Sequence, residues 1–128
     1  MAGDVADAEE LKAYRYAARC ERVRKEWGLH PKPWAILMTL YAAKGDIVPV
    51  RDLCQQLAYR SWRTTGGAKR QIASIKVQVS WLRSRAPVRI ETKASFNADG
   101  SYARLDFGYR LDEASVRRLA EALGDDGR

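Results

Sequence analysis

The sequence predicts a mostly helical α+β protein, and three of its features lead to this fold class. Several segments repeat apolar residues at the three- and four-residue spacing of an amphipathic helix. Two later segments, 88–96 and 105–111, instead alternate apolar and polar residues, as half-buried strands do. With 128 residues, 46% of them apolar, the chain is also long enough to bury a core of its own.

The first 28 residues predict one long helix that ends at Gly28, because glycine commonly closes helices. Six acidic and six basic residues between Met1 and His30 leave the segment without net charge. Two interpretations stay open: the helix packs on its own domain, or it binds a partner or a second copy of the chain. The apolar residues at helical spacing are Tyr16, Cys20, Val23 and Trp27, with Leu11 and Tyr14 close to the same stripe.

Two shorter helices with a strand between them are predicted next. Pro33 suits a first helical position, and the strongly apolar run that follows it stops before Gly45. Ile47 and Val48 predict a short strand, and Pro49 is expected to begin the second helix. The expected buried face of that helix consists of Leu53, Cys54 and Leu57.

A long basic helix is predicted over 68–84, after a loop over 59–67. The face opposite its apolar stripe should be wet, yet Val77 and Trp81 lie on it. Apolar residues on a basic, exposed face are typical of a binding surface. The apolar stripe itself consists of Ile72, Ile75, Val79 and Leu82.

A hairpin over 88–111 and a final helix over 112–124 complete the predicted elements. The sequence Asn-Ala-Asp-Gly favours a turn between the two strands. The phase of alternation changes between Tyr102 and Leu105, which predicts a bulge near Ala103. Asp112 is expected to cap the last helix, whose buried side consists of Val116, Leu119 and Leu123 before Gly124. Residues 125–128 are expected to be a disordered tail.

Most of the positive charge lies in one stretch. Residues 60–93 hold nine Lys and Arg and one acid, a net charge of +8, against +7 for the whole chain. The basicity therefore belongs to the long helix and the start of the hairpin rather than to the surface in general. A basic helix followed by a basic hairpin favours a nucleic-acid partner.

Several functional classes are not expected. No apolar run approaches the ~20 residues that span a bilayer, and the acidic first residues are unlike a secretory signal. Cys20 and Cys54 are expected to be reduced thiols, and with the single His30 they cannot make a usual four-ligand zinc site. No arrangement of catalytic residues is visible, so we expect no enzyme, no metal and no cofactor.

The order of the elements is that of a winged helix-turn-helix over 29–111, with an added helix at 1–28 and another at 112–124. Helix 68–84 would enter the DNA major groove, and the wing, 88–111, would lie on the backbone or minor groove. Val77 would contact a thymine methyl group. Trp81 would either press on the sugar-phosphate backbone or be buried against the wing or the first helix.

Four motifs in 29–111 point to one family. They are the helix start Leu29-His30-Pro31-Lys32-Pro33-Trp34, a glycine at Gly45 before a Val-x-x-x-x-Leu helix, the run Ile75 to Arg83 that ends in Leu-Arg, and Gly108-Tyr109-Arg110-Leu111. In these motifs the chain resembles the DNA-binding domain of OmpR/PhoB-type response regulators. The sequence shows no receiver domain with a phosphoacceptor aspartate, so a stand-alone domain without phosphorelay control is expected.

The resemblance implies a set of DNA contacts. The family's Arg falls at Ala73, so that contact is expected to be lost or moved to Arg70, and the family's His is Gln78. The family's Arg before Leu-Arg is Trp81. The candidate DNA contacts on the helix are Lys69, Arg70, Ala73, Ser74, Lys76, Val77, Gln78, Ser80, Trp81, Arg83 and Arg85. Those on the wing are Arg89, Lys93, Ser95, Asn97 and Arg104.

The resemblance also implies that loop 59–67 touches RNA polymerase or its sigma factor through Arg60, Trp62 and Arg63, unless Trp62 folds onto the core. The expected protein is therefore a sequence-specific duplex-DNA-binding transcription regulator of bacterial or phage origin in the cytoplasm, at the nucleoid. A homodimer through the first or last helix is a further expectation. Two alternatives stay open: a winged helix that docks on polymerase with DNA secondary, and an architectural or replication DNA-binding protein.

Overall fold

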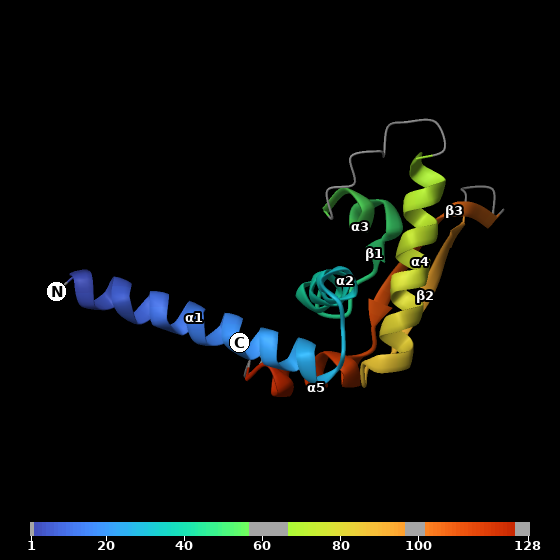
Figure 1. Cartoon of the computed structure of the whole chain (residues 1–128). Coiled ribbons are helices and arrows are strands. Elements are labelled where there is room, and N and C mark those ends of the chain that lie inside the picture. Colours follow the sequence, from blue (N-terminus) through green and yellow to red (C-terminus); the bar gives the residue numbers. More distant parts are fainter. Residues whose placement is uncertain (1, 57–66, 97–101, 125–128) are drawn as a thin grey trace.

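The computed structural model describes the backbone of residues 2–56, 67–96 and 102–124, and the side chains of 8–55, 71–93 and 107–124. Over these ranges the chain forms five helices and a small three-stranded antiparallel sheet, which confirms the predicted mostly helical α+β class. The elements, shown in Figure 1, are α1 (Ala2–Glu26), α2 (Pro31–Ala42), β1 (Val48–Pro49), α3 (Val50–Gln56), α4 (Gly67–Arg85), β2 (Ile90–Phe96), β3 (Tyr102–Leu111) and α5 (Glu113–Ala122).

The sheet has the strand order β1-β3-β2, so β3 lies in the middle. β2 and β3 pair antiparallel, with Ile90 opposite Leu111 at one end. The register shifts opposite Ala94–Phe96, where β3 holds extra residues before Phe107. The bulge predicted near Ala103 falls in this stretch, so the expected irregularity is confirmed.

The core lies where α2, α3 and α4 meet one another and the sheet. The whole apolar stripe predicted for the long helix is buried, which confirms that α4 packs through this face. Burying one Leu or Ile side chain stabilises a fold by about 1.5–3 kcal/mol. The stripe therefore contributes a large part of the free energy that packs α4 against the core. The fully buried side chains include Ile36, Leu37, Leu40, Leu53, Ile75, Val79, Leu82 and Leu111.

Several predicted boundaries were wrong by one or two residues; for example, α4 is Gly67–Arg85 rather than 68–84, and β2 begins at Ile90 rather than at 88. α2 begins at Pro31 rather than Pro33, because His30 already has the extended backbone of an N-cap and proline at the first position loses no helical hydrogen bond. The short strand is Val48–Pro49, so Ile47 lies outside it and the next helix begins after Pro49. Pairing with β3 decides this position.

Gly108 explains how β1 and β3 come so close. A Cβ atom at this position would lie 2.6 Å from the carbonyl oxygen of Val48. Only glycine permits this approach, because atoms at such a distance would have to move apart. The short strand β1 therefore ties the segment before α3 to the middle of the sheet.

The last helix begins and ends as the sequence predicts. The backbone N–H of Ser115 donates a hydrogen bond of 2.8 Å to Oδ1 of Asp112, the N-cap. Leu119 and Leu123 are buried, and Gly124 follows with a φ of 68°. The Ser115 hydroxyl also accepts a hydrogen bond of 2.6 Å from the backbone N–H of Arg89, which joins α5 to the segment before β2.

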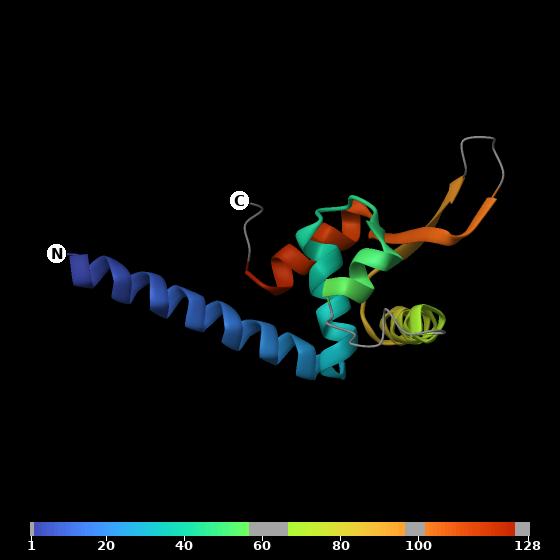
Figure 2. The ribbon, with the colours of Figure 1, turned by 90° about the horizontal axis from the view of Figure 1, so that it is seen from above.

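α1 projects from the rest of the molecule as an arm, as Figures 1 and 2 show. Its last turns pack on the body: Val23 is buried, and the Trp27 and Trp34 rings meet edge to face at 6.4 Å. Its earlier turns do not, and Tyr14 is 73% exposed. Packing on the body, one of the two open interpretations, therefore holds only for the C-terminal part of the helix.

Some expectations lie outside the described residues. These are Leu57 as a buried residue, the loop with Arg60, Trp62 and Arg63, the Asn-Ala-Asp-Gly turn with Asn97, and the tail 125–128. The side chains of Lys69, Arg70, Ser95 and Arg104 are also outside the described set, although their backbones belong to α4, β2 and β3.

Candidate nucleic-acid interface

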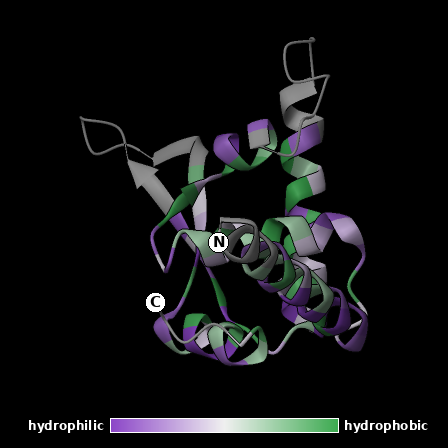
Figure 3. Ribbon diagram, turned by 90° about the vertical axis from the view of Figure 1, so that its left-hand side faces the viewer, coloured by the Kyte–Doolittle hydropathy of each residue, from purple (hydrophilic) through white to green (hydrophobic). Residues whose placement is uncertain are grey.

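α4 separates its side chains into two faces. Its inner stripe is buried, with Ile75, Val79 and Leu82 at 0% exposure. On the opposite face Val77 is 53% and Trp81 39% exposed. The helix contains no acidic residue. α4 therefore presents apolar groups and positive charge together on a face that the fold leaves open, and Figure 3 shows this mixture of hydropathies along the helix.

Several of the predicted DNA contacts lie on this outer face of α4 or beside it. Ala73, Lys76 and Ser80 are exposed, whereas Ser74 and Gln78 are half-buried. The Lys76 ammonium lies 5.3 Å from the centroid of the Phe107 ring on β3, which places it between α4 and the hairpin. The middle of α4 thus combines small, polar and basic side chains.

Arg83 has an internal partner. Its guanidinium donates two hydrogen bonds to the carbonyl oxygen of Ile90, through Nε at 3.2 Å and Nη2 at 2.9 Å. The same Nη2 donates to the hydroxyl of Thr92 at 2.9 Å. Because Arg83 is exposed but held by β2, its geometry is that of a clamp between α4 and the hairpin rather than of a free phosphate ligand.

The Arg83 clamp also lies near Tyr109, the neighbour of Thr92 on β3. The guanidinium carbon is 5.9 Å from the centre of the tyrosine ring. Burial raises the pKa of the Tyr109 hydroxyl, although the nearby positive charge of Arg83 partly offsets this effect. The phenol is therefore neutral across the physiological range.

Arg85 and Trp81 connect α4 to the end of α1. The Arg85 guanidinium lies 4.2 Å from the Trp81 ring centroid and donates a hydrogen bond of 3.3 Å to the carbonyl oxygen of Gly28. The His30 ring also lies near Trp81, with its centroid 6.1 Å away in an edge-to-face arrangement. Trp81 thus packs on the junction after α1 and still exposes part of its ring. This position lies between the two predicted alternatives, burial inside the protein and full exposure toward a DNA backbone.

Lys93, one of the predicted DNA contacts on the hairpin, points away from α4. Thr92 contacts Arg83, so its neighbours Glu91 and Lys93 point to the other side of the sheet. Glu91 forms ion pairs of 3.4 Å with both Lys93 and Arg110. The hydrogen bond from Lys93, followed by the charge of Arg110, lowers the pKa of the Glu91 carboxyl. Lys93 is therefore partly neutralised and distant from the outer face of α4, whereas Arg89 is exposed just before β2.

Two features of the site were not identified from the sequence: the Thr92 hydroxyl that accepts from Arg83, and the burial of a polar residue, Gln71, on α4. Thr92 is the polar interruption in the apolar series of β2, and this break in the alternation was the available signal. Gln71 is 3% exposed, beside the inner stripe of α4. Its burial had no signal in the sequence, because a polar residue beside a stripe normally remains wet.

Other kinds of site have little support in the described part of the chain. None of its helices is both long and apolar enough to cross a membrane. Its residues include no group of three or more His, Cys, Asp or Glu that could hold a metal ion. Cys20 and Cys54 are free thiols on α1 and α3, and burial raises the pKa of each, which lowers their reactivity.

Comparison of the chain with protein-family models, curated proteins and solved structures found no match. The resemblance to the OmpR/PhoB family therefore depends on the sequence motifs alone. The structural features that bear on function are the two faces of α4 and the hairpin that Arg83 holds beside it.

Proposed function

We propose that the chain is a winged helix-turn-helix protein that binds duplex DNA and regulates transcription, with α4 as the recognition helix and β2–β3 as the wing. One observation carries this proposal: α4 is anchored along its length by a buried stripe and leaves an acid-free, partly apolar face open. An α-helix, roughly 10–12 Å across with its side chains, fits a major groove about 12 Å wide.

The order of the elements supports the same function. Two helices and a short strand precede α4, the hairpin follows it, and the strand order is β1-β3-β2. This arrangement places a helix beside a hairpin, with Arg83 as a direct link between them. A duplex could then be gripped by the helix in one groove while the hairpin extends along the backbone.

The contacts of individual residues divide the candidate residues into two roles. Arg83 and Arg85 position the recognition helix, because both are held by carbonyl oxygens of the protein. The DNA-contacting role remains with the exposed middle of α4, through Lys76, Val77 and Ser80, and with Lys69, Arg70, Ala73, Ser74, Gln78 and Trp81 as the sequence predicts. Contact of loop 59–67 with RNA polymerase remains a proposal from the resemblance.

The test is selection of bound duplexes from a random pool, followed by titration at several salt concentrations. Lys76→Ala should weaken binding to all sequences and reduce the salt slope by about 0.9, because one phosphate contact is lost. Val77→Ala should instead relax the preference for thymine at one position. The matched control is Arg117→Ala, since Arg117 is an exposed base on α5. Equal effects of Lys76→Ala and Arg117→Ala, or no saturable duplex binding, would contradict the proposal.

A protein partner is the second candidate, because Val77 and Trp81 form an exposed apolar pair. Such a pair would bind an apolar patch on polymerase with little dependence on salt. Pull-down of purified RNA polymerase in high salt distinguishes the two functions. DNA binding through phosphates should be lost under these conditions, whereas apolar docking should persist and should weaken on Trp81→Ala.

A further inference from the structure

The first described turns of α1 form an exposed arm. The helix has 25 residues and is roughly 37 Å long at 1.5 Å per residue. Every described side chain from Ala8 to Ala18 is exposed, and the first anchor to the body is Arg19, which donates a hydrogen bond of 3.1 Å to the carbonyl oxygen of Leu123. Isolated helices shorter than about 12–15 residues are marginal in water. A partner that covers these exposed turns would therefore stabilise them.

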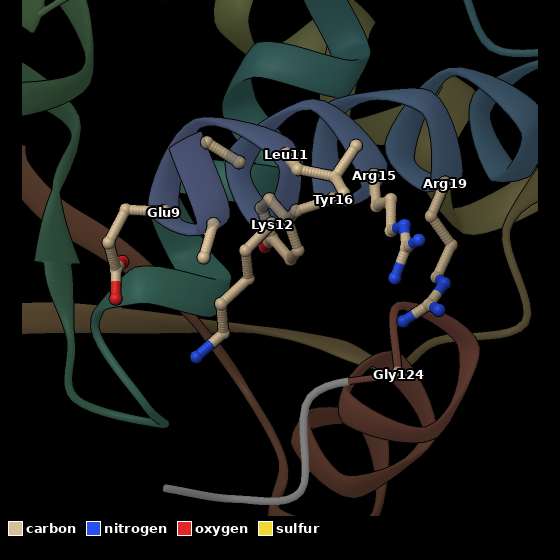
Figure 4. Close-up of a pocket in the computed structure, with 9 residues that line it drawn as sticks. Glu9, Leu11, Lys12, Arg15, Tyr16, Arg19 and Gly124 are labelled. Atoms are coloured by element: carbon tan, nitrogen blue, oxygen red, sulfur yellow. The ribbon is translucent and has the colours of Figure 1, made fainter. Parts of the chain in front are cut away.

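The inner side of the arm does not close onto its own domain. An open groove of about 750 Å³ separates it from the end of α5, and Figure 4 shows Arg15 and Arg19 pointing across it toward Gly124. Tyr16 lines this groove and is 42% exposed. The body therefore leaves the arm's apolar groups without a covering layer.

The arm also carries an apolar seam, which consists of Leu11 at the edge of the groove and of Tyr14 and Ala18 beyond it. Their spacing of three and then four residues is that of the contact positions in a two-helix coiled coil. Leu11 is 49% and Tyr14 73% exposed. Tyrosine is enriched in protein interfaces, because it combines a large apolar ring with a hydroxyl that tolerates water.

The charges along α1 are sorted into two blocks. Residues 2–10 contain four acids and no base, whereas residues 11–26, to the end of α1, contain six bases and two acids. The acidic block comprises Asp4, Asp7, Glu9 and Glu10, and the basic block Lys12, Arg15, Arg19, Arg22, Arg24 and Lys25. When two copies of such a helix pair antiparallel, the acids of one copy face the bases of the other. When they pair parallel, acids face acids and bases face bases.

We propose that α1 is a self-association arm that pairs antiparallel with α1 of a second copy of this chain, around the seam of Leu11, Tyr14 and Ala18. This charge pattern favours a second copy of α1 as the partner, because α1 is complementary to itself in the antiparallel orientation. An acidic protein would satisfy only the basic block, and DNA would be repelled by the acidic block. The pairing is two-fold symmetric, so each copy contributes the same surface. This inference does not depend on DNA binding.

The experiment measures the mass of the full chain, without DNA, by light scattering and sedimentation. The wild type should be a dimer. Asp7→Lys with Glu10→Lys should be monomeric, and so should Arg22→Glu with Lys25→Glu, because at helical spacing these positions flank the seam and each variant places like charges opposite one another. An equimolar mixture of the two variants should form a heterodimer at low salt. A monomeric wild type, or a mixture that stays monomeric, would overturn the proposal.

The control is Lys44→Glu with Arg117→Glu, which makes the same charge change as the base-to-Glu variant but at exposed positions outside the arm, and which should remain dimeric. Circular dichroism should show that all variants keep their helices. Orientation is tested with spin labels introduced as unnatural amino acids at Ala8 or Ala13, both exposed. Antiparallel pairing gives a longer label-to-label distance at Ala8 than at Ala13, whereas equal distances would overturn the antiparallel arrangement.

Discussion

α4 and α1 both expose large apolar side chains, but they are held and charged in different ways. α4 is anchored along its whole described length by a buried stripe, whereas α1 is anchored only near its C-terminal end. α4 carries positive charge alone, and α1 carries a block of each sign. A helix of one sign on a rigid base fits a polyanion, and a projecting helix with both signs fits a copy of itself. The distribution of charge, more than the exposed apolar area, therefore distinguishes the proposed partners.

The largest expected effect separates the two faces of α4. Ile75→Ala should lower the free energy of unfolding by about 2–5 kcal/mol, because it leaves a cavity at a fully buried position. Val77→Ala should change it by less than about 0.5 kcal/mol, since Val77 is more than half exposed. Urea unfolding of both variants checks the contrast. Similar losses would mean that the outer face of α4 is also packed.

The next effect concerns the clamp between α4 and the hairpin. Arg83→Ala should cost about 1–3 kcal/mol of unfolding free energy, because the Ile90 carbonyl oxygen loses two hydrogen bonds beside a buried side chain. Arg83→Lys keeps the charge but not the planar fork, so it should recover only part of the loss. Thermal unfolding measures stability, and DNA titration is run in parallel. A loss of DNA affinity with unchanged stability would make Arg83 a direct phosphate contact.

A smaller effect is expected at the N-terminus of α5. Asp112→Ala removes the N-cap of α5 and should cost about 1 kcal/mol. The hydrogen bond from Ser115 lowers the pKa of the folded Asp112 carboxyl. Its stabilising contribution is therefore present above the unfolded pKa, near about 3.9, and is lost as the pH falls through the lower folded value. The free energy of unfolding should be measured at pH 7 and in this acidic window. The difference between the wild type and Asp112→Ala should become smaller as the pH falls.

The smallest effect tests whether the free turns of α1 contribute to the fold. Leu11→Ala should change the unfolding free energy by less than about 0.5 kcal/mol in protein dilute enough to be monomeric, because Leu11 is 49% exposed. Val23→Ala, at a buried position on the same helix, should cost more. The comparison uses urea unfolding at two protein concentrations. A large, concentration-independent loss for Leu11→Ala would show that the arm folds back on its own domain.

Patterns within single helices and strands predicted most of the fold. The stripe from Ile72 to Leu82 predicted the inner face of α4, because a period near 3.6 residues can be buried on one side only as a helix. Gly28, Asp112 and Gly124 predicted helix ends through local backbone chemistry. The bulge in β3 was visible in the same way, since a change of phase requires an extra residue.

Contacts between distant segments decided the rest. The sequence by itself determined which residues are apolar at helical or strand spacing and where positive charge gathers. The tertiary structure decided that β1 begins at Val48, that Arg83 holds β2, and that the first turns of α1 remain uncovered. The physical reason is that periodicity records how one segment divides its own surface, whereas a partner across space depends on the path of the whole chain.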